Sequence, residues 1–326
     1  MANYLVTGTA GFIGARLVEV LLSQGHTVTG VDNMNNAYDV RMKEFRLRRL
    51  QVLPGFTFHK LDISERKNME ELAGLQPVPF DAVINMAARA GVRASVEDPW
   101  IFYEANVMGT LNLLELCRQC SIPKFLTAST AGVYGDKAPR PTPEEADTDH
   151  PLQPYAASKK ASEVLAHAYH KLHGIDVTVV RFFNVYGPAP RPEMVIFRFA
   201  KWITEGEPVE LFGDGEQSRG FTYLDDIVRG TIAGLKPMGY EIINLGGHQP
   251  LNLNELIRIL EKRIGKKARV KQLPANPADI RASLANVDKA RRLLGWQPEV
   301  GLDEGIGYLV DWYNAERTWA RETVKP

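Results

Sequence analysis

Residues 4–14 read Tyr4-Leu5-Val6-Thr7-Gly8-Thr9-Ala10-Gly11-Phe12-Ile13-Gly14, and this stretch decides the fold of the chain. Its first four residues are an apolar run typical of a buried strand, and an apolar pattern at helical spacing follows the glycines as far as Gly25. Glycines allow a tight turn and let backbone N–H groups approach a pyrophosphate at the positive end of the helix dipole. The stretch therefore predicts a strand, a phosphate-binding turn and a helix.

The next predicted strand, residues 27–31, ends in Asp32. This is about the distance beyond a glycine turn at which a carboxylate meets the ribose of adenosine. A carboxylate at that position favours NAD over NADP, because NADP carries a phosphate there. The glycines follow the spacing G-x-x-G-x-x-G, and together with Asp32 they predict an NAD site.

The alternation of strand and helix continues through the first 181 residues. Further strands are predicted at 56–61, 82–86, 124–127 and 177–180, and further helices at 65–75, 99–120 and 154–174. Strands joined by helical crossovers form a parallel sheet with helices on both faces. The fold class is therefore α/β, a doubly wound parallel Rossmann sheet, in which ligands bind beyond the carboxyl ends of the strands.

After residue 181 the alternation stops, and prolines interrupt a mixture of short helices and short strands. We expect a smaller mixed α/β C-terminal lobe that binds substrate, made of about 182–221 and 249–326. The NAD-binding domain would comprise 1–181 and about 222–248, because a helix near Asp225 and a strand at 241–245 are predicted to return to the first sheet. Asn252 and Glu255 are spaced as a helix capping box, and Asp214-Gly215 is interpreted as a hairpin turn.

Composition excludes several classes of function. Lys plus Arg and Asp plus Glu both total 39, so no overall field would attract nucleic acid or an anionic membrane. No basic region precedes an apolar segment at the N-terminus, and no apolar run approaches ~20 residues, so we expect a cytoplasmic protein. Cys117 and Cys120 are interpreted as packing residues of a helix rather than a redox or metal site, and no metal is expected.

Tyr155 and Lys159 stand four residues apart at the start of a predicted helix, so they share one face of it. A phenol has a pKa of about 10, and a neighbouring ammonium group is the simplest way to make it a proton acceptor near neutral pH. Taken alone, the spacing is also compatible with two surface residues. Beside a predicted dinucleotide site, it indicates an acid/base pair.

Together these motifs resemble those of the extended short-chain dehydrogenase/reductases that act on nucleotide sugars, over essentially the whole chain. The residues that carry the resemblance are Gly8, Gly11, Gly14, Asp32, Asp62-Ile63, Ala87-Ala88, Asn106, Ser129-Thr130, Val133-Tyr134-Gly135, Tyr155, Lys159, Arg181 to Pro188 and Asp225-Asp226. The resemblance implies a tightly bound NAD that is reduced and reoxidised within one turnover. It also implies a catalytic triad of Thr130, Tyr155 and Lys159.

The same resemblance implies a set of cofactor-binding residues: Gly8, Gly11, Phe12, Ile13, Gly14, Asp32, Asn33, Asp62, Ile63, Ala87, Ala88, Asn106, Thr127, Tyr155, Lys159 and Phe182. The chemistry of alcohol oxidation agrees with the triad, since a base must take the hydroxyl proton while hydride leaves the carbon. Tyr155 would be that base. Lys159 would lower its pKa and hold the nicotinamide ribose, and Thr130 would orient the sugar oxygen.

Ala131 and Gly132 follow the triad threonine, and they restrict the set of possible reactions. Relatives that are 4,6-dehydratases carry Asp-Glu at these positions, and UDP-glucuronate decarboxylases have a Glu in place of Gly132. The remaining reaction needs no second acid or base: a 4-keto sugar rotates in the pocket and receives hydride on its opposite face. The sequence therefore favours an NAD-dependent 4-epimerase, with dehydratase, decarboxylase and 4-ketoreductase as lesser alternatives.

Two segments indicate the substrate. The run 87–95 contains A-G-V-R, and Arg191-Pro192-Glu193-Met194 is similar to the R-P-D-M of UDP-glucuronate 4-epimerases. Arginine is well suited to bind a carboxylate or diphosphate bidentately. Ala131-Gly132 and Asn184 depart from that subfamily, which has Ser-Ser and Thr there. UDP-glucuronate is favoured, and UDP-glucose or UDP-N-acetylglucosamine is the alternative.

The resemblance places the nucleotide part of the UDP-sugar against the second lobe, with Arg219 and Arg281 as phosphate ligands. The candidate substrate-binding residues are Arg93, Ser129, Thr130, Asn184, Arg191, Val195, Gln217, Arg219 and Arg281. A homodimer is also expected, because relatives commonly pair through the helices near 99–120 and 154–173.

Overall fold

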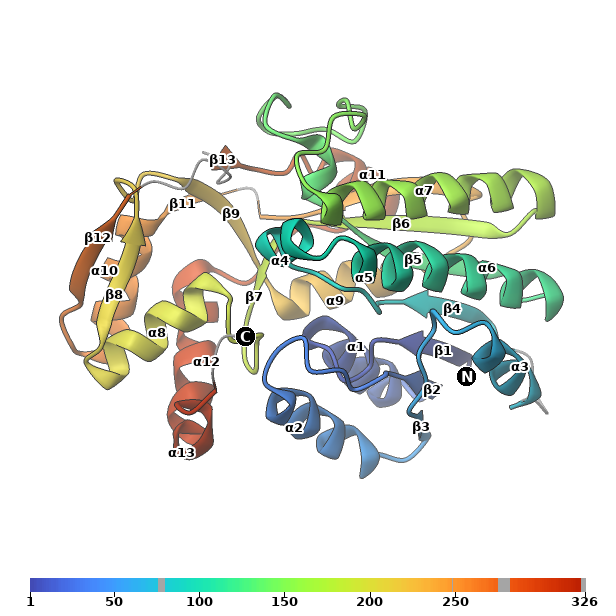
Figure 1. The fold of residues 1–326 in the computed structure, drawn as a ribbon, viewed down its shortest axis with the longest axis horizontal. Coiled ribbons are helices and arrows are strands. Elements are labelled where there is room, and N and C mark those ends of the chain that lie inside the picture. Colours follow the sequence, from blue (N-terminus) through green and yellow to red (C-terminus); the bar gives the residue numbers. More distant parts are fainter. Residues whose placement is uncertain (76–79, 248, 275–281, 324–326) are drawn as a thin grey trace.

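The computed structural model describes residues 1–75, 80–247, 249–274 and 282–323, and it confirms the predicted α/β architecture (Figure 1). Its largest sheet has seven strands in the order β10-β6-β5-β4-β1-β2-β3, and every neighbouring pair is parallel. The strands are β1 (Asn3–Thr7), β2 (Thr27–Val31), β3 (Phe56–His59), β4 (Ala82–Asn85), β5 (Lys124–Thr130), β6 (Asp176–Phe182) and β10 (Tyr240–Leu245). The strand order reverses between β1 and β4, which is where doubly wound sheets bind ligands.

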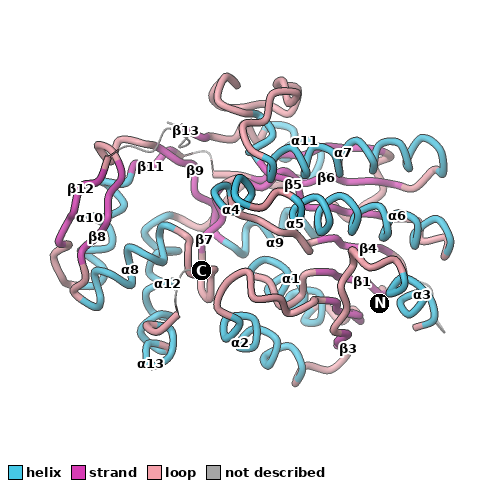
Figure 2. The backbone as a smooth tube through the Cα atoms, viewed as in Figure 1, coloured by secondary structure: helices cyan, strands magenta, loops and turns pink. Residues whose placement is uncertain are grey.

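Helices cover both faces of this sheet because its strands are apolar on both sides. One core lies under α1 (Phe12–Ser23), α2 (Val40–Gln51), α9 (Leu224–Ala233) and α11 (Asp288–Leu294). The other core lies under α3 (Lys67–Gly74), α6 (Gly109–Gln119) and α7 (Pro154–His173). The tube drawing shows these layers as helices on either side of the central strands (Figure 2).

The helix predicted at 99–120 is not a regular α-helix throughout. It consists of α5 (Trp100–Tyr103), a π-helical turn η1 (Glu104–Met108) and α6, and it is preceded by the short α4 (Val92–Glu97). A π turn inserts an extra residue and redirects side chains, and such turns are frequent at functional sites. Here it carries Asn106, whose side chain binds both backbone groups of Arg89 at the edge of the sheet.

The second lobe contains two small sheets and a group of helices. β8 (Pro208–Phe212) pairs with β12 (Arg269–Leu273), while β9 (Ser218–Tyr223) pairs with β7 (Asn184–Tyr186), β11 (Pro250–Asn252) and β13 (Ala282–Ser283). They pack with α8 (Val195–Glu205), α10 (Leu253–Ile264) and α12 (Leu302–Ala315), and α13 (Arg317–Ala320) follows. The last two helices lie beside α8, away from β3 (Figure 1).

Two local predictions for this lobe have different outcomes. The capping box is confirmed, because Asn252 Oδ1 accepts from Glu255 N at 2.8 Å and Glu255 Oε2 accepts from Asn252 N at 3.2 Å. The hairpin predicted at Asp214-Gly215 is wrong. The turn there joins β8 to β9, and these two strands belong to different sheets.

The chain returns to the large sheet after β9, as predicted. α9 packs against α1, and β10 adds the seventh strand beside β6. α11 also packs against β10 and α9, so a further segment of the C-terminal half covers the first sheet. Within the described ranges, none of the helices is long and apolar enough to span a membrane.

Candidate active site

A cleft of about 290 Å³ opens at the carboxyl ends of the strands. Its walls come from the turn after β1, the ends of β2, β4, β5 and β6, the start of α7 and the loop that follows β7. Seventeen of the predicted site residues line it, namely Gly8, Gly11, Phe12, Ile13, Gly14, Asp32, Asn33, Asp62, Ile63, Ala87, Ala88, Ser129, Thr130, Tyr155, Lys159, Phe182 and Arg191. The cleft therefore brings most of the predicted cofactor site and the whole predicted triad together.

The turn leaves no space for a side chain at its glycine positions. Gly8 has φ +71°, and a Cβ on it would lie 2.7 Å from the backbone N of Ala87. A Cβ on Gly14 would lie 2.1 Å from the carbonyl oxygen of Gly8, so α1 begins directly against the turn. This close approach leaves the first N–H groups of α1 at the cleft, which is the arrangement that binds a pyrophosphate.

Asp32 is held in place at the end of β2. Its carboxylate accepts hydrogen bonds from Ala10 N at 3.2 Å and Met34 N at 2.8 Å, and Lys43 Nζ lies 3.4 Å from Oδ1. Lys43 is itself buried and also donates to Asn35 at 3.2 Å. The sequence analysis missed Lys43, Asn35 and Tyr38, which complete this wall of the cleft.

Asp62 and Asn33 form the neighbouring wall. Asn33 Nδ2 donates to Asp62 Oδ2 at 2.8 Å, and Ser64 donates to the other oxygen. Burial alone would raise the pKa of Asp62, but the hydrogen bonds from Ser64 and Asn33 outweigh it and lower the pKa. A carboxylate is therefore present at neutral pH beside Asp32, where it can accept hydroxyl groups.

Tyr155 occupies the first turn of α7, whose N-terminus is favoured by Pro154 at its first position. Its ring packs edge-on against Phe102 with centroids 6.1 Å apart, which fixes its direction. Burial raises the pKa of Tyr155, and the charge of Arg191 and a hydrogen bond with Thr130 partly offset this. The phenol is therefore protonated at rest and needs additional positive charge to accept a proton.

Lys159 lies one turn further along α7 and is only 2% exposed. Burial lowers its pKa to about 8, although the negative charge of Glu163 acts in the opposite direction. Within the part of the chain that the structure describes, Lys159 Nζ has no hydrogen-bond partner. A buried ammonium group without partners is unfavourable unless a ligand supplies acceptors. The hydroxyl groups of a nicotinamide ribose fit this requirement.

Glu163 lies beneath this pair. It accepts hydrogen bonds from Ser129 Oγ at 2.5 Å and from Arg181 at 2.9 and 2.7 Å, and Arg181 also donates to Tyr134 Oη at 2.9 Å. Glu163 and Arg181 are both 2% exposed. Ser129, which is a predicted substrate ligand, therefore lines the cleft with its hydroxyl group bound to Glu163. The network ties the end of β5 to α7 and β6.

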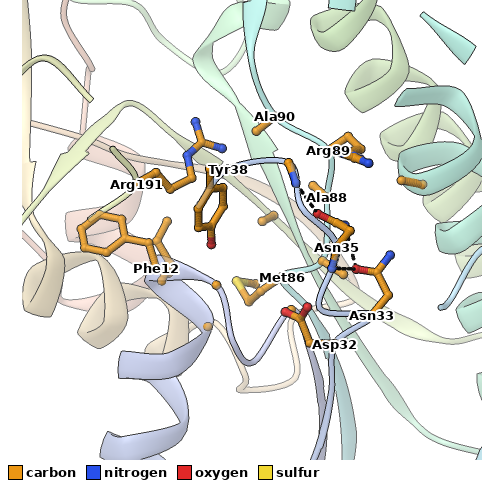
Figure 3. A pocket seen from close by; sticks show the side chains of 18 of the residues that line it. Phe12, Asp32, Asn33, Asn35, Tyr38, Met86, Ala88, Arg89, Ala90 and Arg191 are labelled. Atoms are coloured by element: carbon orange, nitrogen blue, oxygen red, sulfur yellow. Dashed lines mark hydrogen bonds between the residues drawn. The ribbon is translucent and has the colours of Figure 1, made fainter. Parts of the chain in front are cut away.

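Arg46 connects the cofactor turn to the second lobe. Its guanidinium donates to the carbonyl oxygens of Ala10, Ala189 and Pro190 at 3.0, 2.9 and 3.0 Å. Ala10 belongs to the glycine turn, and Pro190 directly precedes Arg191. Arg191 extends into the pocket on the same side of the view as Tyr38, across from Asn33 and Arg89 (Figure 3). Its guanidinium forms an ion pair with Glu193, with Nε and Oε1 2.9 Å apart.

The remaining predicted residues do not line the cleft. Asn106 supports it from behind through Arg89 and through Ser158 Oγ at 2.9 Å, and Thr127 is buried beneath it beside Asn85. Arg93 is exposed and stacks on Phe212, with 5.2 Å to the ring centroid. Asn184, Val195, Gln217 and Arg219 lie in the second lobe, outside the cleft. Arg281 lies outside the described residues.

Two other predictions concern metals and cysteines. Cys117 and Cys120 are free thiols, and burial raises the pKa of both. Among the residues with described positions, no group of three His, Cys, Asp or Glu side chains could hold a metal ion.

The fold and the cleft define a class of protein: a doubly wound nucleotide-binding enzyme in which a Tyr–Lys pair meets the carboxyl ends of the strands. The family follows from comparison with known sequences. The chain belongs to the NAD dependent epimerase/dehydratase family, whose model matches residues 4–246. This confirms the predicted resemblance.

Three of the relatives are 4-epimerases of UDP-sugars. The chain is 50% identical over 313 residues to "UDP-glucuronate 4-epimerase" of Thermodesulfobacterium geofontis, covering 96% of each protein. It matches UDP-glucuronic acid 4-epimerase of Bacillus cereus in complex with UDP-glucuronic acid and NAD, with TM-score 0.90, 35% identity and coverage of 96% of this chain and 99% of that one. It also matches a Thermotoga maritima UDP-glucose 4-epimerase with UDP-glucose, with TM-score 0.89, 32% identity and coverage of 97% and 99%.

Proposed function

We propose that this protein is an NAD-dependent UDP-glucuronate 4-epimerase, an isomerase that interconverts UDP-glucuronate and UDP-galacturonate. The observation that carries the proposal is the geometry of one end of the cleft. Thr130, Tyr155 and Lys159 meet there, Arg191 faces them, and Ala131 and Gly132 provide no further acid or base. The 50% identity to a UDP-glucuronate 4-epimerase supports the choice of substrate.

The residues of the cleft fit NAD. The turn from Gly8 to Gly14 offers backbone N–H groups to the pyrophosphate, and Asp32 and Asp62 offer acceptors to the adenosine end. Lys159 has the unsatisfied ammonium group that a nicotinamide ribose would complete. When NAD is bound, it supplies the hydride acceptor and donor for C4 of the sugar.

Tyr155 moves the proton. It accepts the proton of the C4 hydroxyl as the sugar is oxidised and returns it as the sugar is reduced, while Thr130 holds the same oxygen in line. Lys159 favours the phenolate, and Arg191 adds positive charge that lowers the pKa of Tyr155. Because one base serves both half-reactions, the 4-keto sugar must turn its other face toward the nicotinamide between them.

Arg191 favours a uronate. It lines the cleft from the loop that follows β7, and a guanidinium binds a carboxylate better than a hydroxymethyl group. The Thermotoga protein of similar fold is a UDP-glucose 4-epimerase. UDP-glucose is therefore the comparison substrate for the preference at C5.

The proposal is tested by incubating the purified protein separately with UDP-glucuronate, UDP-glucose and UDP-N-acetylglucosamine, without added cofactor, and identifying the products by NMR. We expect UDP-galacturonate from UDP-glucuronate and no lasting absorbance of reduced nicotinamide. The Tyr155→Phe protein should lose about 10²–10⁴-fold in rate. Stoichiometric consumption of NAD(P)H, release of CO₂, or full activity of Tyr155→Phe would overturn the proposal.

We further propose that the chain has the two-lobe division of 1–181 with 222–248 and 182–221 with 249–326, and acts in the cytoplasm as a homodimer. Large apolar side chains support the dimer. On α5 and α7, which pack against each other, Trp100 is 77% exposed, Val164 57% and Leu172 74%. Burying such side chains against a second copy would be favourable.

Light scattering tests the dimer. Val164→Lys should shift the proposed dimer toward monomer. Val52→Lys changes a valine beyond α2 that is even more exposed, at 80%, and it should leave the mass unchanged. A wild-type protein that elutes as a monomer at micromolar concentration would contradict the dimer.

A further inference from the structure

Glu193 has two carboxylate oxygens in different situations. Oε1 forms the ion pair with Arg191 Nε at 2.9 Å, and both side chains are largely covered, with exposed fractions of 28% and 26%. Oε2 is buried and has no hydrogen-bond partner in the described part of the chain. Glu193 lines the same cleft as Tyr155 and Arg191.

An unpaired, buried carboxylate oxygen is unfavourable, so a structure that retains one in a ligand cleft indicates that the ligand supplies a donor. A pyranose ring carries hydroxyl groups that can do so. Oε1 differs from Oε2 because it already forms an ion pair with the guanidinium of Arg191. A uronate carboxylate would bind to the same guanidinium. Glu193 and a bound uronate therefore compete for Arg191.

The competition for Arg191 would help the sugar carboxylate to leave the arginine during epimerisation. The sugar must turn over between oxidation and reduction, so any contact between its carboxylate and Arg191 has to break during each turnover. A guanidinium left without an acceptor in a covered cleft would oppose that step. Glu193 can take Arg191 back as soon as the carboxylate departs, because the two side chains are only two residues apart.

We propose that Glu193 is an exchange partner for Arg191: it pairs with the arginine whenever the sugar carboxylate is absent or turning, and its second oxygen accepts a sugar hydroxyl when the carboxylate is bound. This inference rests on the proposed function, because it requires a substrate with a carboxylate at C5. In this role Glu193 affects the choice of substrate and the rate at which the sugar turns over, and it does not carry a proton.

The inference has a distinctive consequence for Glu193→Gln, which keeps the shape of the side chain and removes its charge. A uronate no longer competes with a carboxylate for Arg191, so it should bind more tightly and leave more slowly. A ligand without the carboxylate gains nothing and loses an acceptor for its hydroxyl group. The two kinds of ligand should therefore respond in opposite directions.

Binding is measured by calorimetry on the Tyr155→Phe protein with its cofactor, so that no turnover occurs, using UDP-glucuronate, UDP-glucose and UDP. Adding Glu193→Gln should lower the Kd for UDP-glucuronate about tenfold, which corresponds to about 1.4 kcal/mol of binding free energy. UDP-glucose should bind equally or more weakly, and UDP should be unchanged. Equal changes for all three ligands, or weaker binding of UDP-glucuronate, would overturn the exchange.

Kinetics supply a second readout on the otherwise wild-type enzyme. Glu193→Gln should lower both KM and kcat for UDP-glucuronate, because tighter ground-state binding opposes the turning step. Glu115→Gln is the matched control, since it removes the acid of another Arg–Glu pair, with Arg118 at 2.8 Å on α6 and outside the cleft. It should change neither constant. A lower kcat with an unchanged or higher KM would contradict the exchange.

The two proposals fail in different ways. If the wild-type protein binds UDP-glucuronate but does not epimerise it, the proposed function is wrong, and the binding series still decides the exchange. If the protein epimerises UDP-glucuronate and Glu193→Gln leaves the ratio of UDP-glucuronate to UDP-glucose affinity unchanged, the exchange alone is wrong.

Discussion

Lys159 and Glu163 lie one helical turn apart on the buried face of α7, and the charge of Glu163 raises the pKa of Lys159 against the effect of burial. Glu163 is fixed for this purpose, since Ser129 and Arg181 bind both of its oxygens. This face of α7 therefore carries Tyr155, Lys159 and Glu163 at four-residue spacing, and only the phenol and the ammonium group were predicted from the sequence.

Glu163→Gln should narrow the pH range of activity. In the proposed mechanism Lys159 assists Tyr155 as an ammonium group. Activity should therefore be lost as pH rises through the pKa of Lys159, which burial lowers to about 8 before ligands bind. Without the Glu163 charge the pKa falls further, so the alkaline limb of the pH–rate profile should move to lower pH. Ser129→Ala is the control, because it removes one hydrogen bond and keeps the charge. An alkaline limb that does not move would contradict this role of Glu163.

Lys159→Met should make the ligand-free protein more stable and inactive. The pKa of Lys159 is about 8 in the fold and 10.5 in the unfolded chain, a difference equivalent to about 3 kcal/mol. The cost of burying the charge is fully present below pH 8 and decreases as pH rises toward 10.5. The stability gain of the variant, measured by urea unfolding, should therefore be largest at neutral pH and shrink by pH 10. A loss of stability at pH 7 would refute it.

Gly14→Ala should abolish cofactor binding. Its Cβ would lie 2.1 Å from the carbonyl oxygen of Gly8, so either α1 or the turn must move away from the pyrophosphate site. Gly74→Ala is the matched control at the last residue of α3, where a Cβ meets nothing within 4 Å. That variant should retain its cofactor and gain up to about 1 kcal/mol, because alanine restricts the unfolded chain. Bound NAD is measured after denaturing the purified proteins.

Arg46→Met should lower both the stability of the protein and its affinity for the sugar part of the substrate. It leaves the carbonyl oxygens of Ala10, Ala189 and Pro190 without their donor, at a cost of about 1–3 kcal/mol each if no water replaces it. The segment before Arg191 is then no longer fixed to the cofactor turn. We expect a lower melting temperature and a KM for UDP-glucuronate that rises more than the Kd for UDP. Equal changes in both constants would indicate a purely structural role.

Most of the first sheet could be predicted from the sequence because its signals are local. The glycine turn, Asp32 and the apolar strands each fall within a few residues, and the structure places them as expected. α2 was missed for the opposite reason. Lys43 and Arg46 occupy inward positions beside Met42, Leu47 and Leu50, so the apolar stripe of the helix is interrupted by two cations.

Contacts between distant segments also could not be predicted from the sequence. Ser129 and Glu163 are 34 residues apart, and nothing in the residues around Ser129 indicates that its hydroxyl group binds a buried carboxylate. The buried, unpaired oxygen of Glu193 likewise cannot be recognised from its neighbours in the sequence.

The position of β10 has a consequence for the making of the protein. β10 covers the edge of β6, yet it begins at Tyr240, after the strands β7, β8 and β9 of the other lobe. A ribosome releases the N-terminal part first, so β6 remains an unpaired edge until residue 245 has emerged. Open edges promote association between chains. A nascent or truncated chain that stops before residue 245 should therefore aggregate and depend on chaperones, although it contains every residue of the proposed catalytic triad.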